Sequence, residues 1–139
     1  MSDISHLDPT LALTISTWDD SAPYQEMDIE TSRWGEPGGK NAQFVVQPYF
    51  VPANVVRFLA PAGRLTYSFD WEPGRVSFRA VRGLASATTS DAVAAHVFTS
   101  GVPSPANEVV HLNLYVFDNR RFSLRHGVEV IFEKFEYLP

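Results

Sequence analysis

The chain has 139 residues, no cysteine and a formal net charge of −5, with 16 acidic against 11 basic side chains. The absence of cysteine excludes disulfide and thiolate chemistry, and the acidic balance argues against sequence-independent binding of nucleic acid. The length predicts a single domain over 1–139, and the 45% content of hydrophobic residues is typical of a globular chain. No apolar run approaches the roughly 18 residues that a membrane helix needs, so we expect no membrane partner.

Turn signals at short intervals separate stretches in which apolar and polar residues alternate, which is the pattern of an all-β sandwich or barrel. The first two alternating stretches cover 11–16 and 24–32. The other predicted strands cover 42–51, 54–60, 64–71, 75–83, 95–100, 108–117 and 128–138. The Pro-Gly pair at 73–74 predicts a hairpin, and the Ala-, Ser- and Thr-rich residues 86–95 predict a loop or one helical turn. We expect about nine strands and no long helix.

Residues 26–30 read Glu-Met-Asp-Ile-Glu, with an acid at every second position. Because successive side chains of a strand point to opposite faces, Glu26, Asp28 and Glu30 share one face. Met27 and Ile29 then pack into a core between two sheets. One interpretation is that the acids form the solvated side of an antiparallel sheet. The other is that they act on one substrate, because three like charges without an intervening base repel each other.

The spacing of the outer two acids is compatible with a glycosidase pair. On a strand, the Cα atoms of Glu26 and Glu30 lie about 13 Å apart. Each side chain can lean inward by roughly 4 Å, which leaves a carboxyl gap of about 5 Å, the range of retaining glycosidases. The charge of Asp28 between them would raise the proton affinity of a neighbour, as a general acid requires near neutral pH.

Other residues supply matching faces. Tyr24 shares the face of the acids, and aromatic rings are a natural platform for sugar rings. In 108–117, His111, Asn113 and Tyr115 share one side that mixes hydrogen-bonding and aromatic groups, as a sugar cleft does. Gln47 lies on the polar side of 42–51. Each set could also be the polar side of an ordinary sandwich strand.

The stretch Glu26-Met27-Asp28-Ile29-Glu30 resembles the signature of glycoside hydrolase family 16, in which Glu, an aliphatic residue, Asp, an aliphatic residue and Glu follow on one strand. Three later stretches resemble the family's hairpin, its late cleft strand and its final strand. They read "TYSFDWEPGRVSFRAVRG", "HLNLYVF" and "VEVIFEKFEYLP". All four occur in the family's order, "SRWG" and "NAQFVVQPY" resemble a bacterial branch, and the resemblance covers roughly residues 10–139.

This resemblance implies a concanavalin A-like β-jelly roll of two stacked, curved sheets and a retaining endo-β-glycosidase that hydrolyses β-glucan-type polysaccharides. Glu26 would be the nucleophile, Glu30 the general acid and then the base, and Asp28 would orient and tune them. Aromatic candidates would stack on sugar rings and polar ones would bind hydroxyls. The substrate-binding candidates are Tyr24, Trp18, Trp34, Gln47, His111, Asn113 and Tyr115.

The resemblance implies an oligo- or polysaccharide as the partner. We expect no cofactor and no metal, because the four histidines do not have the spacing of metal ligands. The family is secreted or periplasmic, although the first ten residues lack the pattern of a signal peptide.

The acid motif begins at residue 26, whereas family members carry several strands before it. We therefore expect an N-terminally shortened sandwich with unpaired strand edges and exposed apolar faces. A homodimer, a strand exchange or a separate N-terminal piece could cover them. Two alternatives to the enzyme remain open: a carbohydrate-binding jelly roll without turnover, and a sandwich used for protein interaction.

Overall fold

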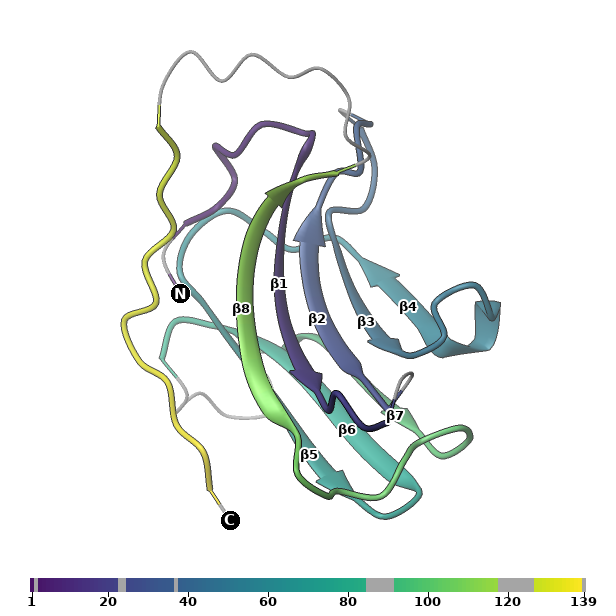
Figure 1. The fold of residues 1–139 in the computed structure, drawn as a ribbon. Coiled ribbons are helices and arrows are strands. Elements are labelled where there is room, and N and C mark those ends of the chain that lie inside the picture. Colours follow the sequence, from purple (N-terminus) through teal and green to yellow (C-terminus); the bar gives the residue numbers. More distant parts are fainter. Residues whose placement is uncertain (2, 23–24, 37, 85–91, 118–126, 139) are drawn as a thin grey trace.

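The computed structural model describes the whole chain apart from residues 2, 23–24, 37, 85–91, 118–126 and 139. Two antiparallel sheets pack face to face as a β-sandwich, which confirms the expected fold class (Figure 1). The strands are β1 (Leu11–Trp18), β2 (Met27–Ser32), β3 (Ala42–Val46), β4 (Val55–Phe58), β5 (Leu65–Glu72), β6 (Arg75–Arg82), β7 (Ala92–Phe98) and β8 (Val109–Val116). A 3-10 turn, η1 (Pro52–Asn54), precedes β4. Nowhere in the described ranges is a helix long and apolar enough to cross a membrane.

The larger sheet has the strand order β4-β3-β2-β1-β8, and the smaller sheet has the order β5-β6-β7. The first four strands form a meander, in which each strand pairs with the next. After the smaller sheet, β8 returns to the larger one and pairs with the whole of β1, from Leu11 opposite Val116 to Trp18 opposite Val109. This return places the late strand β8 beside β1 and two strands away from β2, which carries Asp28 and Glu30.

The core lies between the two sheets. From the larger sheet, Met27 and Ile29 are buried, as the alternation of residues 26–30 predicts. The rings of Phe44 and Phe78 stack across the interface with centroids 5.1 Å apart. Trp71 packs against the same cluster while half-buried, and its indole N–H donates to the carbonyl of Pro103 at 2.9 Å.

The predicted hairpin at 73–74 is confirmed. Pro73 and Gly74 connect β5 to β6, and Glu72 pairs with Arg75 across the turn. Gly74 has φ +74°, a left-handed conformation that glycine adopts without steric cost.

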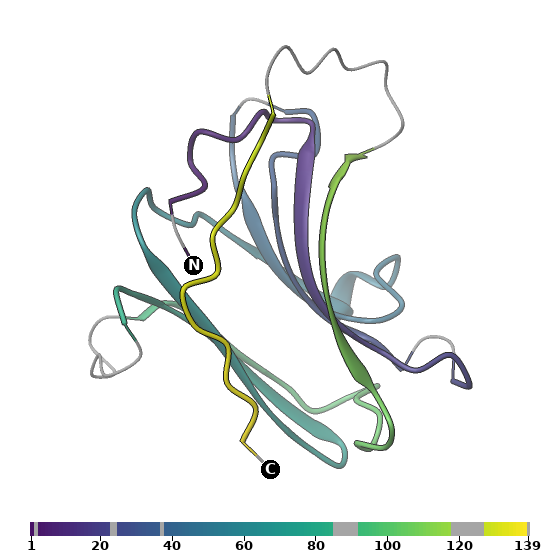
Figure 2. The same ribbon diagram turned by 60° about the vertical axis from the view of Figure 1, so that its left-hand side comes forward.

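The prediction of a ninth strand over 128–138 was wrong. This segment is extended but belongs to neither sheet, and it runs along the side of the molecule where β8 is the edge strand (Figures 1 and 2). An ion pair of 3.0 Å between Arg64 and Glu133 attaches it to the start of β5. Alternation predicts an extended backbone, but a ladder also needs a neighbouring strand within hydrogen-bonding distance.

Two predicted boundaries also change. β3 ends at Val46 and does not continue through Pro48, which has no N–H to donate to a ladder. β7 begins at Ala92, inside the stretch predicted as a loop or helical turn, and the earlier part of that stretch lies outside the described residues.

The inner side of β8 is poorly covered. Leu112 and Leu114 point to the same side of the sheet as buried Leu13, yet they are 45% and 39% exposed. Among the described residues β8 pairs with β1 alone, and no residue of β8 belongs to the core clusters. The edge strand therefore exposes part of an apolar face.

Candidate functional site

The outer face of the larger sheet brings most of the candidate residues together. Because all the strands are antiparallel and in register, side chains form rows across the sheet. One row consists of Asn113, Thr14, Glu30, Gln43 and Arg57. The next row consists of His111, Ser16, Asp28, Val45 and Val55. In both rows the residue of β1 is small, so the acids of β2 and the polar residues of β8 flank a line of short side chains.

Asp28 is a buried carboxyl in the middle of the site, with 2% of its surface exposed. The side-chain amide of Gln47 donates to its Oδ2 at 2.8 Å. Burial, and then the charge of Glu26, raise the pKa of Asp28 to about 9. A hydrogen bond with the Glu26 carboxyl and the charge of Glu30 act in the same direction. Asp28 is therefore neutral at pH 7 and can donate its proton to Glu26.

Glu30 is half-buried on the same face, and burial raises its pKa above the ordinary value. The side-chain amide of Gln43 opposes this by donating to Glu30 Oε2 at 2.7 Å. The charge of Glu26 raises the pKa further, whereas the charge of Arg57 and a hydrogen bond from Trp34 lower it. Glu30 thus has a raised proton affinity and donors that stabilise its ionised form.

Glu26 lies one residue before β2 instead of within it. Its backbone carbonyl accepts a hydrogen bond from the N–H of Gln47 at 3.0 Å, so the ladder with the chain after β3 continues to this residue. The charge of Glu26 acts on both Asp28 and Glu30. The three carboxyls therefore lie within electrostatic reach of one another, as their spacing predicts.

Tyr115 faces the acids from β8. Its pKa is raised by burial first and then by the charges of Glu30, Asp28 and Glu26. Two strand spacings separate β8 from β2, which is about 10 Å. His111 and Asn113 are exposed on the same face of β8. The residues expected to bind sugar from this strand thus lie across β1 from the acids.

The remaining candidates differ in their placement. Gln47 contacts Asp28 directly. Trp34 follows β2 with φ 47°, and its ring lies 4.3 Å from the guanidinium carbon of Arg57. Trp18 shares the face of the acids, but its indole N–H already donates to Asp20 Oδ1 at 2.7 Å. Tyr24 lies outside the described residues.

Gln43 and Arg57 contribute to this site although neither is among the predicted site residues. Arg57 donates through Nε to Gln43 Oε1 at 2.8 Å, and Gln43 in turn donates to Glu30. The alternation in 42–51 places Gln43 on the outer face. The contact with Arg57 depends on the register between β3 and β4, which no local pattern encodes.

Comparisons with protein-family models, with curated proteins and with solved structures gave no match. The interpretation of the site therefore rests on its own geometry. In the described part of the chain, no cluster of three or more His, Cys, Asp or Glu side chains could hold a metal ion. The groups that can react at this site are carboxyl groups with different proton affinities, which lie on one face of the sheet.

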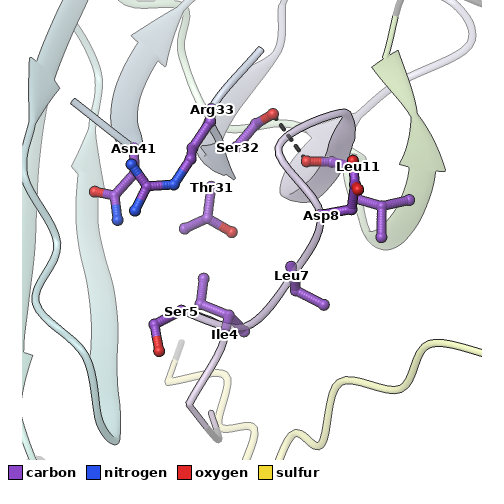
Figure 3. Close-up of a pocket in the computed structure, with 9 residues that line it drawn as sticks. All are labelled: Ile4, Ser5, Leu7, Asp8, Leu11, Thr31, Ser32, Arg33 and Asn41. Atoms are coloured by element: carbon purple, nitrogen blue, oxygen red, sulfur yellow. Dashed lines mark hydrogen bonds between the residues drawn. The ribbon is translucent and has the colours of Figure 1, made fainter. Parts of the chain in front are cut away.

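A small pocket lies elsewhere, between the N-terminal segment and the ends of β1 and β2 (Figure 3). Its lining residues are Ile4, Ser5, Leu7, Asp8, Leu11, Thr31, Ser32, Arg33 and Asn41. The Ser32 hydroxyl donates to the carbonyl of Leu11 at 2.8 Å, and the Asp8 carboxylate accepts from Thr10. None of the three acids lines this pocket, so it is separate from the carboxyl site.

Proposed function

We propose that this protein is a retaining endo-β-glycosidase that hydrolyses β-glucan-type polysaccharides, with the jelly-roll fold of glycoside hydrolase family 16. Glu26 is the nucleophile and Glu30 the acid/base. The observation that carries the proposal is the buried Asp28 between these two carboxyls, because its raised pKa keeps it protonated at neutral pH. A sheet that used these acids only for solubility would not bury the middle one.

In the first step, the Glu26 carboxylate attacks the anomeric carbon while Glu30 donates its proton to the leaving glycosidic oxygen. The bond from carbon to that oxygen breaks, and a covalent ester to Glu26 forms. Burial raises the pKa of Glu30, which favours the protonated form that this step requires. The proton of Asp28 stays in its hydrogen bond with Glu26 and orients that carboxylate toward the sugar.

In the second step, the Glu30 carboxylate takes a proton from water, and the oxygen of that water attacks the anomeric carbon. The ester to Glu26 breaks, the sugar leaves with its original anomeric configuration, and Glu30 is protonated again. Glu30 must therefore exist in both protonation states. The hydrogen bond from Gln43 supports the ionised state, and burial supports the neutral state.

Substrate binding is assigned to the face of β8. The ring of Tyr115 would stack on a sugar, and the Asn113 amide would bind a hydroxyl. Both lie on an open sheet face, so a long polysaccharide could cross the site without threading an end into a closed pocket. This arrangement supports endo-acting cleavage.

A second candidate is a carbohydrate-binding jelly roll without turnover. The half-exposed Leu112 and Leu114 favour it, because the described residues cover the inner side of β8 poorly. A sheet edge without support would hold Tyr115 and Asn113 less firmly than catalysis requires. The two candidates share the ligand and differ in turnover.

The test is release of reducing ends from lichenan, laminarin and xyloglucan. Wild type would be compared with Glu26→Gln, Glu30→Gln and a control, Asp70→Asn, which changes an exposed carboxyl on β5 of the other sheet. We expect wild type and the control to cleave, and both Gln variants to be at least about 100-fold slower. Binding without release by folded wild type would support the second candidate, and equal release by Glu26→Gln would contradict the assigned nucleophile.

A further inference from the structure

A chain of side chains leads from the edge strand β4 to Glu30. Arg57 pairs with Gln43 in the register between β3 and β4, and Gln43 pairs with Glu30 in the register between β2 and β3. The hydrogen bonds follow this row, with 2.8 Å from Arg57 Nε to Gln43 Oε1 and 2.7 Å from Gln43 Nε2 to Glu30 Oε2. Gln43 is buried, whereas Arg57 is exposed.

Arg57 determines which end of the Gln43 amide faces Glu30. A glutamine amide has an oxygen that accepts and a nitrogen that donates, and a guanidinium group can only donate. Arg57 therefore binds the amide oxygen, and the nitrogen is left to donate to Glu30. Without Arg57, the amide could rotate and present its oxygen, which would favour a protonated Glu30.

Arg57 also holds a second donor to Glu30. Its guanidinium carbon lies 4.3 Å from the centre of the Trp34 ring, and the Trp34 side chain hydrogen bonds with Glu30. Trp34 has φ 47°, a conformation that bulky residues rarely adopt. Its backbone N–H donates to the hydroxyl of Ser32 at 2.9 Å. The indole is thus fixed between the end of β2 and the guanidinium group.

We infer that Arg57 is a positioning residue for Glu30. Arg57 acts through the amide of Gln43 and the ring of Trp34. Its role is to keep two donors on the Glu30 carboxylate, so that Glu30 can lose the proton that burial would otherwise retain. This inference rests on the proposed function for its catalytic meaning, because an acid/base must change its protonation state in each turnover.

Other titratable groups lie on the same face as Glu30. On β2 and just before it, Asp28 and Glu26 are acidic, and on β8, Tyr115 and His111 share the outer face. The neighbouring β1 and β3 present uncharged Thr14 and Gln43. Among the groups of this face, Arg57 of β4 supplies the positive charge that lowers the pKa of Glu30.

The experiment measures the pKa of Glu30 from the side-chain carboxyl signal in carbon-13 NMR titrations, so it does not require turnover. The proteins are wild type, Arg57→Met, Arg57→Lys, Gln43→Met and a control, Arg82→Met, which removes an exposed arginine at the end of β6. We expect the pKa of Glu30 to rise by about half a unit or more in Arg57→Met and Gln43→Met. In Arg57→Lys the pKa of Glu30 should rise less than in Arg57→Met, because lysine retains the charge but not the planar fork. The control should leave the pKa unchanged.

An unchanged pKa in Arg57→Met would overturn the inference, and circular dichroism spectra would show that the variant is folded. Arg57 is exposed, so its replacement should not disturb the core. If wild type cleaves glucan, the alkaline limb of its pH profile should move to higher pH in Arg57→Met, with kcat affected more than KM. A pKa shift in the variants without glucan cleavage by wild type would retain the inference about Arg57 and contradict the proposed function alone.

Discussion

The amide nitrogen of Gln47 lies 2.8 Å from the carboxyl of Asp28 and donates to it on the outer face of the larger sheet. This is the side of an antiparallel sheet that is usually solvated, yet Asp28 is 2% exposed. The single donor does not offset the burial and the neighbouring acids, so the carboxyl holds its proton. A neutral acid at this position separates Glu26 from Glu30 without adding a third charge.

Asp28→Asn should make stability less dependent on pH. The pKa of Asp28 rises from 3.8 to about 9 on folding, so its contribution to stability is complete below about pH 4 and is lost as pH rises toward 9. Asparagine resembles the protonated acid at every pH. We therefore expect the variant to gain stability relative to wild type between pH 4 and pH 8, by a few kcal/mol as measured by urea unfolding.

The pH dependence of cleavage should report Glu30. As the acid, Glu30 must be protonated in the first step, and burial raises its pKa above 4.5. Activity should therefore persist above the pH at which an ordinary glutamate ionises and fall at a higher pH. With an activated aryl glycoside, whose departure needs no acid, Glu30→Gln should lose this alkaline limb. If the alkaline limb persists in Glu30→Gln, a group other than Glu30 causes it.

Tyr67→Phe should leave stability unchanged or raise it by about 1 kcal/mol. The Tyr67 hydroxyl is buried and has no hydrogen-bond partner in the described part of the chain, while its ring packs against both core clusters. Removing the hydroxyl relieves an unsatisfied polar group and retains the packing. Thermal unfolding compares the two proteins, and a lower Tm for the variant would mean that the hydroxyl has a partner in solution.

Leu13 and Leu114 lie opposite each other on β1 and β8, but they are 3% and 39% exposed. Leu13→Ala should therefore cost about 2–5 kcal/mol, and Leu114→Ala about 1 kcal/mol. Urea unfolding of both variants measures the difference. Equal losses would mean that a further element or a second copy of the chain covers the inner side of β8 in solution.

Local patterns predict much of this fold. The alternation of 26–30 places Met27 in the core and the acids outside, because a period of two is a property of the strand itself. The hairpin at 73–74 follows from its turn residues. The contact of Arg57 with Gln43 and the position of 128–138 outside both sheets could not be predicted in this way. Both depend on which strands become neighbours.

The most direct test of the central claim is a proton NMR time course of glucan cleavage by wild type, with Glu26→Gln as the blank. The signals of the newly formed reducing ends show which anomer appears first. A glycosyl ester on Glu26 predicts that the β-anomer appears first and converts slowly to the equilibrium mixture, with no signal from Glu26→Gln. Initial release of the α-anomer, or no release by folded wild type, would contradict the account.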